Sequence, residues 1–452
     1  GGQACFCFFL QGGGKRSFER AVMRLSVVSV GGREVASLET KPAWTLSDVR
    51  SRLSEVTGIA CHRLHLLHGA AELPPGEPLA SLGIVDGSLL TLVVSPPLYV
   101  LTGSRDGTAK LWDVQTGKCL QTLAGHGDEL TSVAFSPMGP ELFTFSQDFT
   151  VKLWNMDTGD CLRTLEARGS GGVGALAAAL SPDGSTALVG CLDGFAKVLS
   201  VDSGECLLML EHDAHVPVAV YSSDGARILT GAADGAVKIW DAHTGKSLLE
   251  LEGAGVAMSA VFSPDSTKVL VAYEFGATMM WNVSSGECLF TLQSWGLAPA
   301  IFSPDGKKVL AASSCGIAEV WDVETSEDLM ALEGHEDEVL SAAYSPCGTW
   351  VITGSRDCTA RIWSAACGEC LVVLEGHEDG VQSASFSADG QQALTVSLDS
   401  TAKIWNTRNG ECLLTLQGHS DAVLAGTFSE TEIYCRESTE STTSPASCCE
   451  TE

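Results

Sequence analysis

A unit of roughly forty residues recurs along this chain, and no other feature constrains its fold as strongly. One complete copy runs from Leu332 to Ser364, with the sequence LEGHEDEVLSAAYSPCGTWVITGSRDCTARIWS, and a further apolar run follows at Cys370–Leu374. Its short β-branched or apolar runs are separated by a Ser-Pro-x-Gly turn and a Ser-Arg-Asp turn. Four short strands per repeat are typical of one blade of a β-propeller. The sequence therefore predicts a mainly β fold built from such blades.

The residue that ends the third run of each copy gives the number of repeats. It is Trp in all copies but one, at Trp112, Trp154, Leu199, Trp240, Trp281, Trp321, Trp363 and Trp405, with spacings of 40 to 45 residues. Eight copies favour an eight-bladed propeller over 98–428, and seven blades with one misread repeat is the alternative. Leu98–Trp112 supplies only two strands of the first blade, and Ala422–Phe428 supplies an unpaired strand. Joining these ends removes both free sheet edges, as closed β architectures require.

These repeats resemble the WD-repeat family over about three quarters of the chain. The resemblance implies a buried, hydrogen-bonded network of His, Thr, Asp and Trp in each regular blade. The sets are His419, Thr102, Asp106 and Trp112; His126, Thr144, Asp148 and Trp154; His212, Thr230, Asp234 and Trp240; His335, Thr353, Asp357 and Trp363; and His377, Thr395, Asp399 and Trp405. A His near an Asp and a hydroxyl also suggests a catalytic triad. Repetition of the set in five repeats favours a structural role instead, because a buried Asp and a buried Trp N–H both need partners.

Repeats three, five and six depart from this pattern. Repeat three keeps Asp193 but ends its third run in Leu199, repeat five has Val271 in place of Thr, and repeat six has Ala311 there. Removing a whole polar set can be nearly neutral for stability, whereas removing one member is not. We interpret these repeats as decayed copies, with a specialised surface as the alternative.

The WD-repeat resemblance also implies a partner-binding face, formed by the loop after each outer strand and by the Asp-containing turn. The candidate residues are Arg105, Glu129, Gln147, Leu192, Trp295, Glu338, Arg356 and Leu398. Loops on a rigid frame are common binding elements, and Arg is favoured at the energetic centre of interfaces. Any one of these residues alone is more readily explained as a solvated or packing side chain. As a set, they form the predicted protein-binding surface.

The segment 23–94 has a different pattern, strand–strand–helix–strand–strand. The expected strands are 23–30, 33–39, 61–69 and 88–94, and a helix begins after a capping box at Thr45 and Asp48, with one apolar face from Val49, Leu53 and Val56. This order resembles the ubiquitin-like β-grasp, an α+β domain. The chain continues as SPPLYV where ubiquitin would end in a di-glycine tail, and Lys41 is the only lysine in the segment. Conjugation to other proteins is therefore not expected.

The ubiquitin-like resemblance implies one further site. Val30, Leu67 and Val93 fall at positions that ubiquitin uses for an exposed apolar patch. The alternative is that they are ordinary core residues, because periodicity alone does not assign the facing of a short strand. Around these domains, we expect residues 1–22 to be an upstream or disordered segment, 95–97 a short stiff linker, and 429–452 a disordered Ser/Thr/Glu-rich tail.

The composition limits the partners. The net charge is −29, and residues 96–452 hold 18 Lys and Arg against 48 Asp and Glu, which disfavours nucleic acid. No apolar run is long enough to cross a membrane. Six of the 17 cysteines (Cys119, Cys161, Cys206, Cys288, Cys370 and Cys412) share one repeat position and are expected to be small buried strand residues. We expect a cytoplasmic protein, with a nuclear location left open.

We find no nucleotide-binding loop, zinc-protease motif, nucleophile elbow or kinase motif set in the sequence. The sequence therefore predicts no enzyme activity, metal, cofactor or small-molecule substrate. The favoured hypothesis is a non-catalytic adaptor whose propeller binds protein partners and whose ubiquitin-like domain docks to ubiquitin-ligase or proteasome components. The alternative is a structural subunit of a stable ciliary, trafficking or RNA-processing assembly, with the ubiquitin-like domain only a packing module.

Overall fold

The structure is a computed structural model that describes residues 23–29, 33–57, 64–69, 71–73, 77–94, 98–137, 139–166, 175–253, 255–274, 277–293 and 300–429. The chain divides into two compact units, Gly1–Pro97 and Leu98–Glu452, called here the N-terminal unit and the repeat unit. Within these described ranges, we find no helix with the length and apolar character that a membrane crossing needs.

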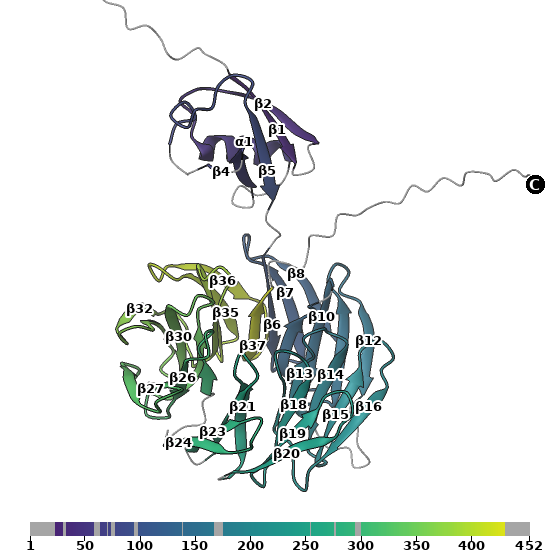
Figure 1. The fold of residues 1–452 in the computed structure, drawn as a ribbon. Coiled ribbons are helices and arrows are strands. Elements are labelled where there is room, and N and C mark those ends of the chain that lie inside the picture. The colour runs from purple at the N-terminus through teal and green to yellow at the C-terminus, as the bar shows by residue number, and fades with distance from the viewer. Residues whose placement is uncertain are drawn as a thin grey trace, which may run out of the picture. The chain divides into compact units, whose positions relative to one another are not determined.

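The N-terminal unit is a sheet packed on one helix (Figure 1). The elements are β1 (Met23–Ser29), β2 (Glu34–Thr40), α1 (Leu46–Thr57), β3 (Leu64–His68), β4 (Ala71–Glu72) and β5 (Leu89–Val94). The strand order is β2-β1-β5-β3-β4, in which β1 and β5 run parallel and the other pairs antiparallel. Alternate residues of these strands are buried against the helix, as a sheet with one covered face requires.

The helix α1 begins as the sequence predicts. The amide and hydroxyl of Thr45 both donate to the Asp48 carboxylate, at 2.7 and 2.9 Å. Its buried residues are Leu46, Val49 and Leu53, all of which join the core. Val56, in the last turn, is 55% exposed, so the prediction that it lies on the apolar face is wrong. The core covers only the first two turns of the helix.

The described part of the repeat unit forms eight four-stranded antiparallel sheets, which we number along the chain. Sheet one contains β37 (Val423–Phe428), β6 (Tyr99–Ser104), β7 (Thr108–Asp113) and β8 (Cys119–Ala124); sheet two β9 (Leu130–Phe135), β10 (Glu141–Ser146), β11 (Thr150–Asn155) and β12 (Cys161–Glu166); sheet three β13 (Ala175–Leu180), β14 (Thr186–Cys191), β15 (Phe195–Ser200) and β16 (Cys206–Glu211); and sheet four β17 (Val218–Tyr221), β18 (Arg227–Gly231), β19 (Ala236–Asp241) and β20 (Ser247–Glu252).

The second half of the repeat unit has the same plan. Sheet five contains β21 (Ala257–Phe262), β22 (Lys268–Tyr273), β23 (Ala277–Asn282) and β24 (Cys288–Gln293); sheet six β25 (Ala300–Phe302), β26 (Lys308–Ala312), β27 (Ile317–Asp322) and β28 (Asp328–Glu333); sheet seven β29 (Val339–Tyr344), β30 (Trp350–Ser355), β31 (Ala360–Ser364) and β32 (Cys370–Leu374); and sheet eight β33 (Val381–Phe386), β34 (Gln392–Ser397), β35 (Thr401–Asn406) and β36 (Cys412–Gln417).

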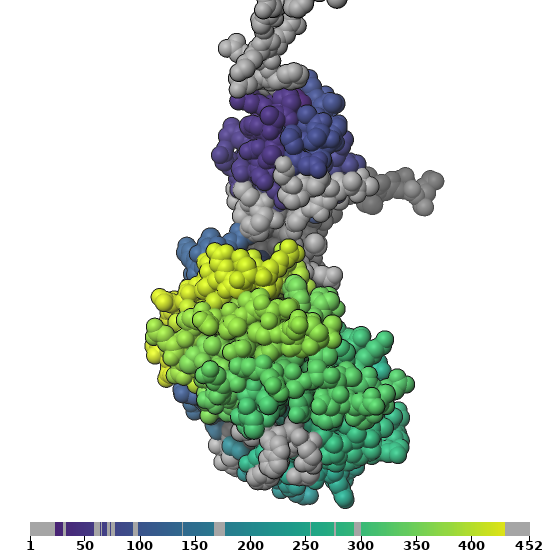
Figure 2. All heavy atoms as spheres, turned by 90° about the vertical axis from the view of Figure 1, so that its left-hand side faces the viewer, coloured from purple at the N-terminus to yellow at the C-terminus, as the bar shows by residue number. Residues whose placement is uncertain are grey.

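The first strand of each sheet is its innermost strand, and these strands form a closed circuit. Each contacts the innermost strand of the next sheet, and β37 contacts both β33 and β9. Sheet one is assembled from both ends of the unit, because β37 pairs antiparallel with β6, with Val423 opposite Ser104 and Phe428 opposite Val100 (Figure 1). In Figure 2 the colours run in order from teal to yellow along one side of the unit, as neighbouring consecutive sheets require. This is the arrangement of a β-propeller.

The fourth strand of each sheet is its outermost, and here one expectation is wrong. The six equivalent cysteines begin outermost strands and are exposed or half-buried, not buried, with free thiols. An outermost strand has no neighbour on one side, so only one of its positions reaches the core. That position holds a leucine such as Leu123 in β8 or Leu165 in β12, whereas the second residue, such as Leu162, stays exposed.

Candidate partner-binding face

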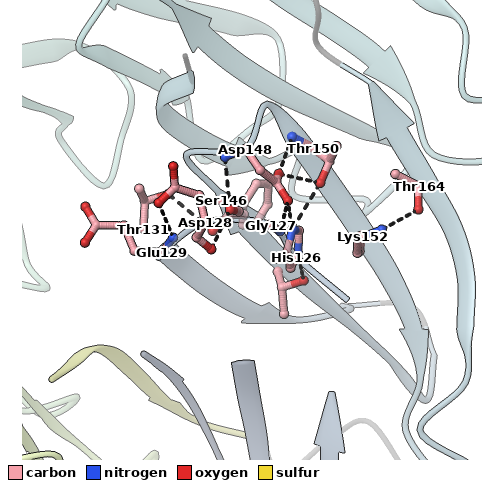
Figure 3. Close-up of polar contacts among 12 residues, drawn as sticks. His126, Gly127, Asp128, Glu129, Thr131, Ser146, Asp148, Thr150, Lys152 and Thr164 are labelled. Carbon is pink, nitrogen blue, oxygen red and sulfur yellow. Dashed lines mark hydrogen bonds and ion pairs between the residues drawn. The ribbon is translucent and has the colours of Figure 1, made fainter. Parts of the chain in front are cut away.

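Sheet two shows how the repeated polar residues meet (Figure 3). His126, which follows the outermost strand of sheet one, places Nδ1 2.9 Å from Asp148 Oδ2 and Nε2 2.7 Å from Thr144 Oγ1. The indole nitrogen of Trp154 donates to the same Thr144 hydroxyl at 2.8 Å. Asp148 also accepts the amide of Gly127 at 2.8 Å and the Thr150 hydroxyl at 2.6 Å. One series of hydrogen bonds therefore joins β10, β11, the turn between them and the loop that precedes the sheet.

The capacity of each side chain to donate or accept determines where the protons lie in this series of hydrogen bonds. An indole nitrogen only donates, so Thr144 accepts from Trp154 and directs its own proton to His126 Nε2. His126 Nδ1 then carries a proton and donates it to Asp148. Every strong donor is satisfied with the imidazole neutral.

Sheets one, seven and eight repeat this geometry. The His Nδ1 to Asp Oδ2 distances are 3.1 Å for His419 and Asp106, 2.8 Å for His335 and Asp357, and 2.7 Å for His377 and Asp399. The His Nε2 to Thr Oγ1 distances are 2.8 Å at Thr102, 2.7 Å at Thr353 and 2.8 Å at Thr395. Trp112, Trp363 and Trp405 each donate to the corresponding Thr at 2.8 Å. The structure thus brings together all four residues in four of the five predicted sets.

The electrostatics of these sets are those of a structural network. Burial lowers the pKa of His126, His335, His377 and His419 below 6.5, and the facing carboxylate offsets this only in part. Burial raises the pKa of Asp106, but hydrogen bonds from Thr108 and from the Ser420 amide outweigh it and bring the pKa to about 2. The imidazoles are therefore neutral and the carboxylates ionised at neutral pH, and all lie inside the sheets.

Sheet four departs from its predicted set. His212 Nε2 lies 2.6 Å from Thr230 Oγ1, and Trp240 donates to that hydroxyl at 2.7 Å. However, Asp234 is exposed, and His212 Nδ1 is buried without a partner among the described residues. The regular sheets place a Thr two residues after the Asp, where its hydroxyl bonds the carboxylate and holds it toward the His; sheet four has Ala236 there. With no carboxylate opposite, burial lowers the pKa of His212 to about 4.

Sheets three, five and six replace the network. In sheet three the Lys197 amine lies 2.9 Å from Asp193, with side chains 5% and 14% exposed, so a nearly buried ion pair takes the place of the His–Asp pair. In sheet five the ring of Tyr273 packs so closely on Gly253 that a Cβ there would lie 2.3 Å from it. Val271 and Ala311 stand where Thr would accept, so the indole nitrogens of Trp281 and Trp321 lose that acceptor and are directed to Tyr273 and Glu319 instead.

Above these networks, the predicted face residues form pairs across the turns. The amide of the residue before the turn Asp donates to a carbonyl of the loop that follows the His, as from Gln147 to Glu129 at 3.0 Å and from Arg356 to Glu338 at 2.9 Å. The side chains pair as well. Arg105 of sheet one binds Glu129 of sheet two at 3.0 Å, and Gln147 also donates to Glu129. Glu129 therefore joins two neighbouring sheets.

In sheet seven, the arginine before the turn Asp pairs with a glutamate of its own sheet and not of the next one. Arg356 binds Glu338 of its own sheet at 3.2 Å, since the residue facing it from sheet eight is Gly380. Both arginine side chains remain more than half exposed, at 51% for Arg105 and 58% for Arg356. Leu192 and Leu398 are half-buried in their turns, and Trp295 lies outside the described residues.

The N-terminal unit places two of its three predicted patch residues together. Leu67 and Val93 are half-buried, absent from the core, and on the sheet face away from α1. They lie on neighbouring strands, where Leu67 pairs with Thr91 and His65 with Val93. Leu89, 54% exposed, lies at a position on β5 with the same facing, a residue that the sequence argument missed. Its period-two spacing from Val93 was the available signal. Val30 lies outside the described residues.

Comparison with known proteins assigns these repeats to a protein family. The family model for the WD domain, G-beta repeat, matches residues 85–113, 117–155, 159–200, 204–241, 326–364 and 368–406, together half of the chain. It does not match 242–325, which holds sheet five and the first three strands of sheet six, where the network is replaced. The chain belongs to the WD-repeat family. Members of this family act as protein-interaction scaffolds.

Individual relatives match over short stretches. The chain is 49% identical over 49 residues to the nuclear distribution protein PAC1 of Cryptococcus neoformans var. neoformans serotype D, which is 11% of each protein. It is 48% identical over 46 residues to the Lissencephaly-1 homolog of Heterostelium pallidum, 10% of this chain and 11% of that one. It is 52% identical over 42 residues to coatomer subunit beta'-1 of Arabidopsis thaliana, 9% of this chain and 5% of that one. The chain thus spans about a tenth of the length of the first of these relatives.

Among solved structures, the chain is similar to the computationally designed Ika8 protein. The TM-score is 0.61 at 28% sequence identity, over 68% of this chain and 93% of that one.

Proposed function

We propose that this protein is a non-catalytic, cytoplasmic adaptor whose eight sheets are the blades of a closed propeller that binds protein partners. One observation supports the proposal above all others. At one end of the repeat unit, the buried polar residues are the same from sheet to sheet, whereas the exposed residues of the turns differ. Below the turns, equivalent polar residues are buried and satisfied in sheet after sheet. Above them, the residues before the turn Asp differ between sheets, and Arg105, Gln147 and Arg356 are exposed. A rigid frame that carries variable side chains is suited to recognition.

The proposal extends to the N-terminal unit. We infer that this unit is a ubiquitin-like β-grasp domain, and that its face with Leu67, Val93 and Leu89 docks to receptors of the ubiquitin-ligase or proteasome type. Val28 and Val35 lie on the same sheet face, which also carries polar residues such as Arg24. A small apolar surface of this kind is suited to a modest, reversible contact. The surface of the repeat unit, in contrast, supplies exposed arginines, which interfaces favour.

Affinity capture from lysate tests both parts. The baits are the intact chain, the double variant Leu67→Ala/Val93→Ala, and a control, Val56→Ala/Val85→Ala, which removes two exposed valines elsewhere in the same unit. We expect proteasome or ubiquitin-ligase subunits with the intact chain and the control but not with the Leu67/Val93 variant. Recovery of one set of proteins by all three baits, without ubiquitin machinery, would contradict the docking proposal.

A second set of baits addresses the repeat unit. Arg105→Ala/Arg356→Ala removes the two exposed arginines of the face, and Arg163→Ala/Arg408→Ala is the control on other strands and turns of the same unit. Partners of the propeller are expected to be lost only with the first variant. Equal recovery by both variants would show that the partner surface lies elsewhere on the propeller.

One observation favours the alternative, a structural subunit of a stable assembly. The second residue of every outermost strand is an exposed leucine, 40 to 53% accessible, at Leu120, Leu162, Leu207, Leu248, Leu289, Leu329, Leu371 and Leu413. Exposed apolar side chains repeated around a circumference suit permanent burial against neighbours. Light scattering of the purified chain and of a captured complex distinguishes the two functions, because an obligate subunit is recovered at one fixed stoichiometry.

A further inference from the structure

A hollow of about 620 Å³ lies between sheets three and four. Its lining includes Val198 of β15 and Leu207 and Leu208 of β16. It also includes Asp183 and Asp224, which belong to the turns that join the first strand of each sheet to the second. These turns lie at the opposite end of the sheets from the turns between the second and third strands, which form the candidate partner-binding face. The hollow is therefore a separate surface, lined by both apolar side chains and carboxylates.

The second strand of sheet three begins with a short side chain, Thr186, which lines the hollow. The pairing of the second and third strands places seven other residues at the same position: Tyr99, Glu141, Arg227, Lys268, Lys308, Trp350 and Gln392. Thr186 has the smallest side chain of the eight, and its hydroxyl lies 2.9 Å from the hydroxyl of Tyr221. Sheet three therefore lacks a side chain at this position that is long enough to extend toward sheet four.

Two of the longer side chains show what such a residue does. Lys308 of sheet six places Nζ 2.9 Å from the carbonyl oxygen of Ala365 in sheet seven. Arg227 of sheet four places Nη1 3.3 Å from the carbonyl oxygen of Ser266 in sheet five. Ala242, in the lining of the hollow, follows the third strand of sheet four as Ala365 follows that of sheet seven. The hollow therefore contains the residue equivalent to the one that binds Lys308, without the cation.

Charge also distinguishes this hollow from the equivalent spaces between the next sheets. The turns between the first and second strands of sheets three to six each carry an aspartate: Asp183, Asp224, Asp265 and Asp305. Three spaces between neighbouring sheets are therefore flanked by two such turns. The second strands of sheets four and five begin with the cations Arg227 and Lys268, whereas that of sheet three begins with Thr186. Of the three spaces, the hollow is the one to which the second strand contributes no positive charge.

Both carboxylates of the hollow can accept further hydrogen bonds. Bonds from the Ser181 and Ser222 hydroxyls are the main cause that lowers the pKa of Asp183 and Asp224 below 3.8, so both are ionised at neutral pH. Within the described ranges, the hydrogen bonds that these two side chains accept all fall on Oδ1 and come from their own turns. Oδ2 of each is therefore available to a donor from outside, and charged donors make the strongest such bonds.

The cations nearby do not occupy the hollow. Arg227 faces Asp241 across the β18–β19 pair and directs its guanidinium to sheet five. Its charge has only a minor effect on the pKa of Asp224, after the larger effect of hydrogen bonds. Lys246 is exposed in the turn before β20 and is absent from the lining, whereas His243 of the same turn is part of it. The two carboxylates therefore favour a cationic occupant.

We propose that the hollow between sheets three and four binds a lysine or arginine side chain of a partner protein, with its charged group between Asp183 and Asp224 and its stem along Leu207. Basic side chains pack an apolar stem on carbon while the charged end stays polar, which matches this lining. The partner supplies the cation that Lys308 supplies between sheets six and seven. This inference rests on the proposed function, that the propeller binds protein partners, and adds a second surface at the opposite end of the sheets from Arg105.

Display of short random peptides tests the proposal. Peptides are selected on the immobilised full chain, and their dissociation constants are measured by fluorescence anisotropy. We expect the selected peptides to share a Lys or Arg. Thr186→Lys gives sheet three the cation of sheet six and should weaken binding by about tenfold or more, the effect of losing one hydrogen bond to a charged group. Gln392→Lys adds the same charge at the equivalent position of β34 and should leave the affinity within about twofold.

A second pair of variants removes charge and keeps the turns intact. Asp183→Asn/Asp224→Asn retains the Oδ1 acceptors and should also weaken binding by about tenfold or more. Asp265→Asn/Asp389→Asn is the control, because these residues accept a Ser hydroxyl in the same way, each at 2.6 Å, in sheets five and eight. Thermal midpoints of all the variants confirm that they are folded. Equal losses in the two members of either pair would mean that general electrostatics, and not this hollow, determines binding.

Three other results would overturn the proposal. One is a set of selected peptides without a common basic residue, or no peptide bound at all. Another is peptide binding that is lost in Arg105→Ala/Arg356→Ala but kept in Thr186→Lys, which would leave the proposed function standing and exclude only this site. The third is a dimer of the full chain, seen by sedimentation, that Thr186→Lys dissociates, because a second copy would then fill the hollow.

Discussion

Sheets one, two, seven and eight differ from sheets five and six in how they fill the same interior position. The first group uses a neutral His between a carboxylate and a Thr hydroxyl, with a Trp donating to the Thr. The second group has apolar residues such as Val271 and Ala311 in place of the Thr. A sheet can fold with the complete polar network or with none of it. The free-energy cost arises when one buried donor or acceptor loses its partner and stays unsatisfied. Trp281 and Trp321, which lose the Thr acceptor, are directed to Tyr273 and Glu319 instead.

Sheets three and four lie between these extremes, and they show what partial replacement requires. Sheet three keeps its carboxylate and neutralises it with Lys197 at 2.9 Å. Sheet four keeps its His, Thr and Trp but leaves Asp234 outside. We therefore expect the two sheets to respond in opposite ways to substitution: sheet three should be easily damaged, and sheet four should be open to improvement.

The largest effect is expected for Lys197→Met. The substitution leaves Asp193, only 14% exposed, without its cation, and should lower the free energy of unfolding by about 3–5 kcal/mol. Lys152→Met is the matched control, since Lys152 occupies the same position in β11 but donates to the exposed Thr164, and it should lose about 1 kcal/mol or less. Denaturant unfolding followed by tryptophan fluorescence measures both. Similar midpoints for the two variants would mean that the Lys197 pair is not a replacement for the network.

The next effect is expected for Thr353→Val in sheet seven. Valine keeps the shape but removes the acceptor of Trp363 and the donor to His335 at one position, so stability should fall by about 2–4 kcal/mol. The control is Thr415→Val, an exposed Thr on an outermost strand, for which a change within about 0.5 kcal/mol is expected. A Thr353→Val protein as stable as the control would show that the network contributes specificity but no stability.

The pH dependence distinguishes sheet four from the complete sheets. The folded pKa of His212 lies at about 4, below its ordinary value of 6.5, so the unfolded chain binds more protons between these values. Stability is therefore fully present above pH 6.5 and falls as the pH drops toward 4. His212→Gln should flatten this decline more than His335→Gln, because Asp357 offsets part of the burial of His335. Thermal midpoints measured across that range test the order, and a steeper profile for His212→Gln would contradict it.

The sequence predicted the four complete sets because their spacing repeats and the chemistry of each member is fixed. The prediction failed at Asp234, because the orientation of this carboxylate depends on a hydroxyl two residues later. The sequence also did not indicate that Lys197 is buried, since the equivalent Lys110, Lys152 and Lys403 donate to exposed Thr residues. The facing of Leu67 required the register of β3 on β5. The contacts between the innermost strands could not be predicted, because these strands are about forty residues apart and meet only when the ring closes.

The smallest expected effect is the repair of sheet four. Ala236→Thr restores the hydroxyl that fixes the carboxylate in the regular sheets, as Thr150 does for Asp148 at 2.6 Å, and it should draw Asp234 toward the orphaned Nδ1 of His212. One recovered hydrogen bond stabilises by about 0.5–1.5 kcal/mol. Ala277→Thr is the control, because sheet five offers neither a His nor an Asp at the matching position. If Ala236→Thr raises both the unfolding midpoint and the pKa of His212, measured by NMR titration, the missing hydroxyl alone accounts for the open network. If neither changes, the His212 loop itself holds Asp234 away.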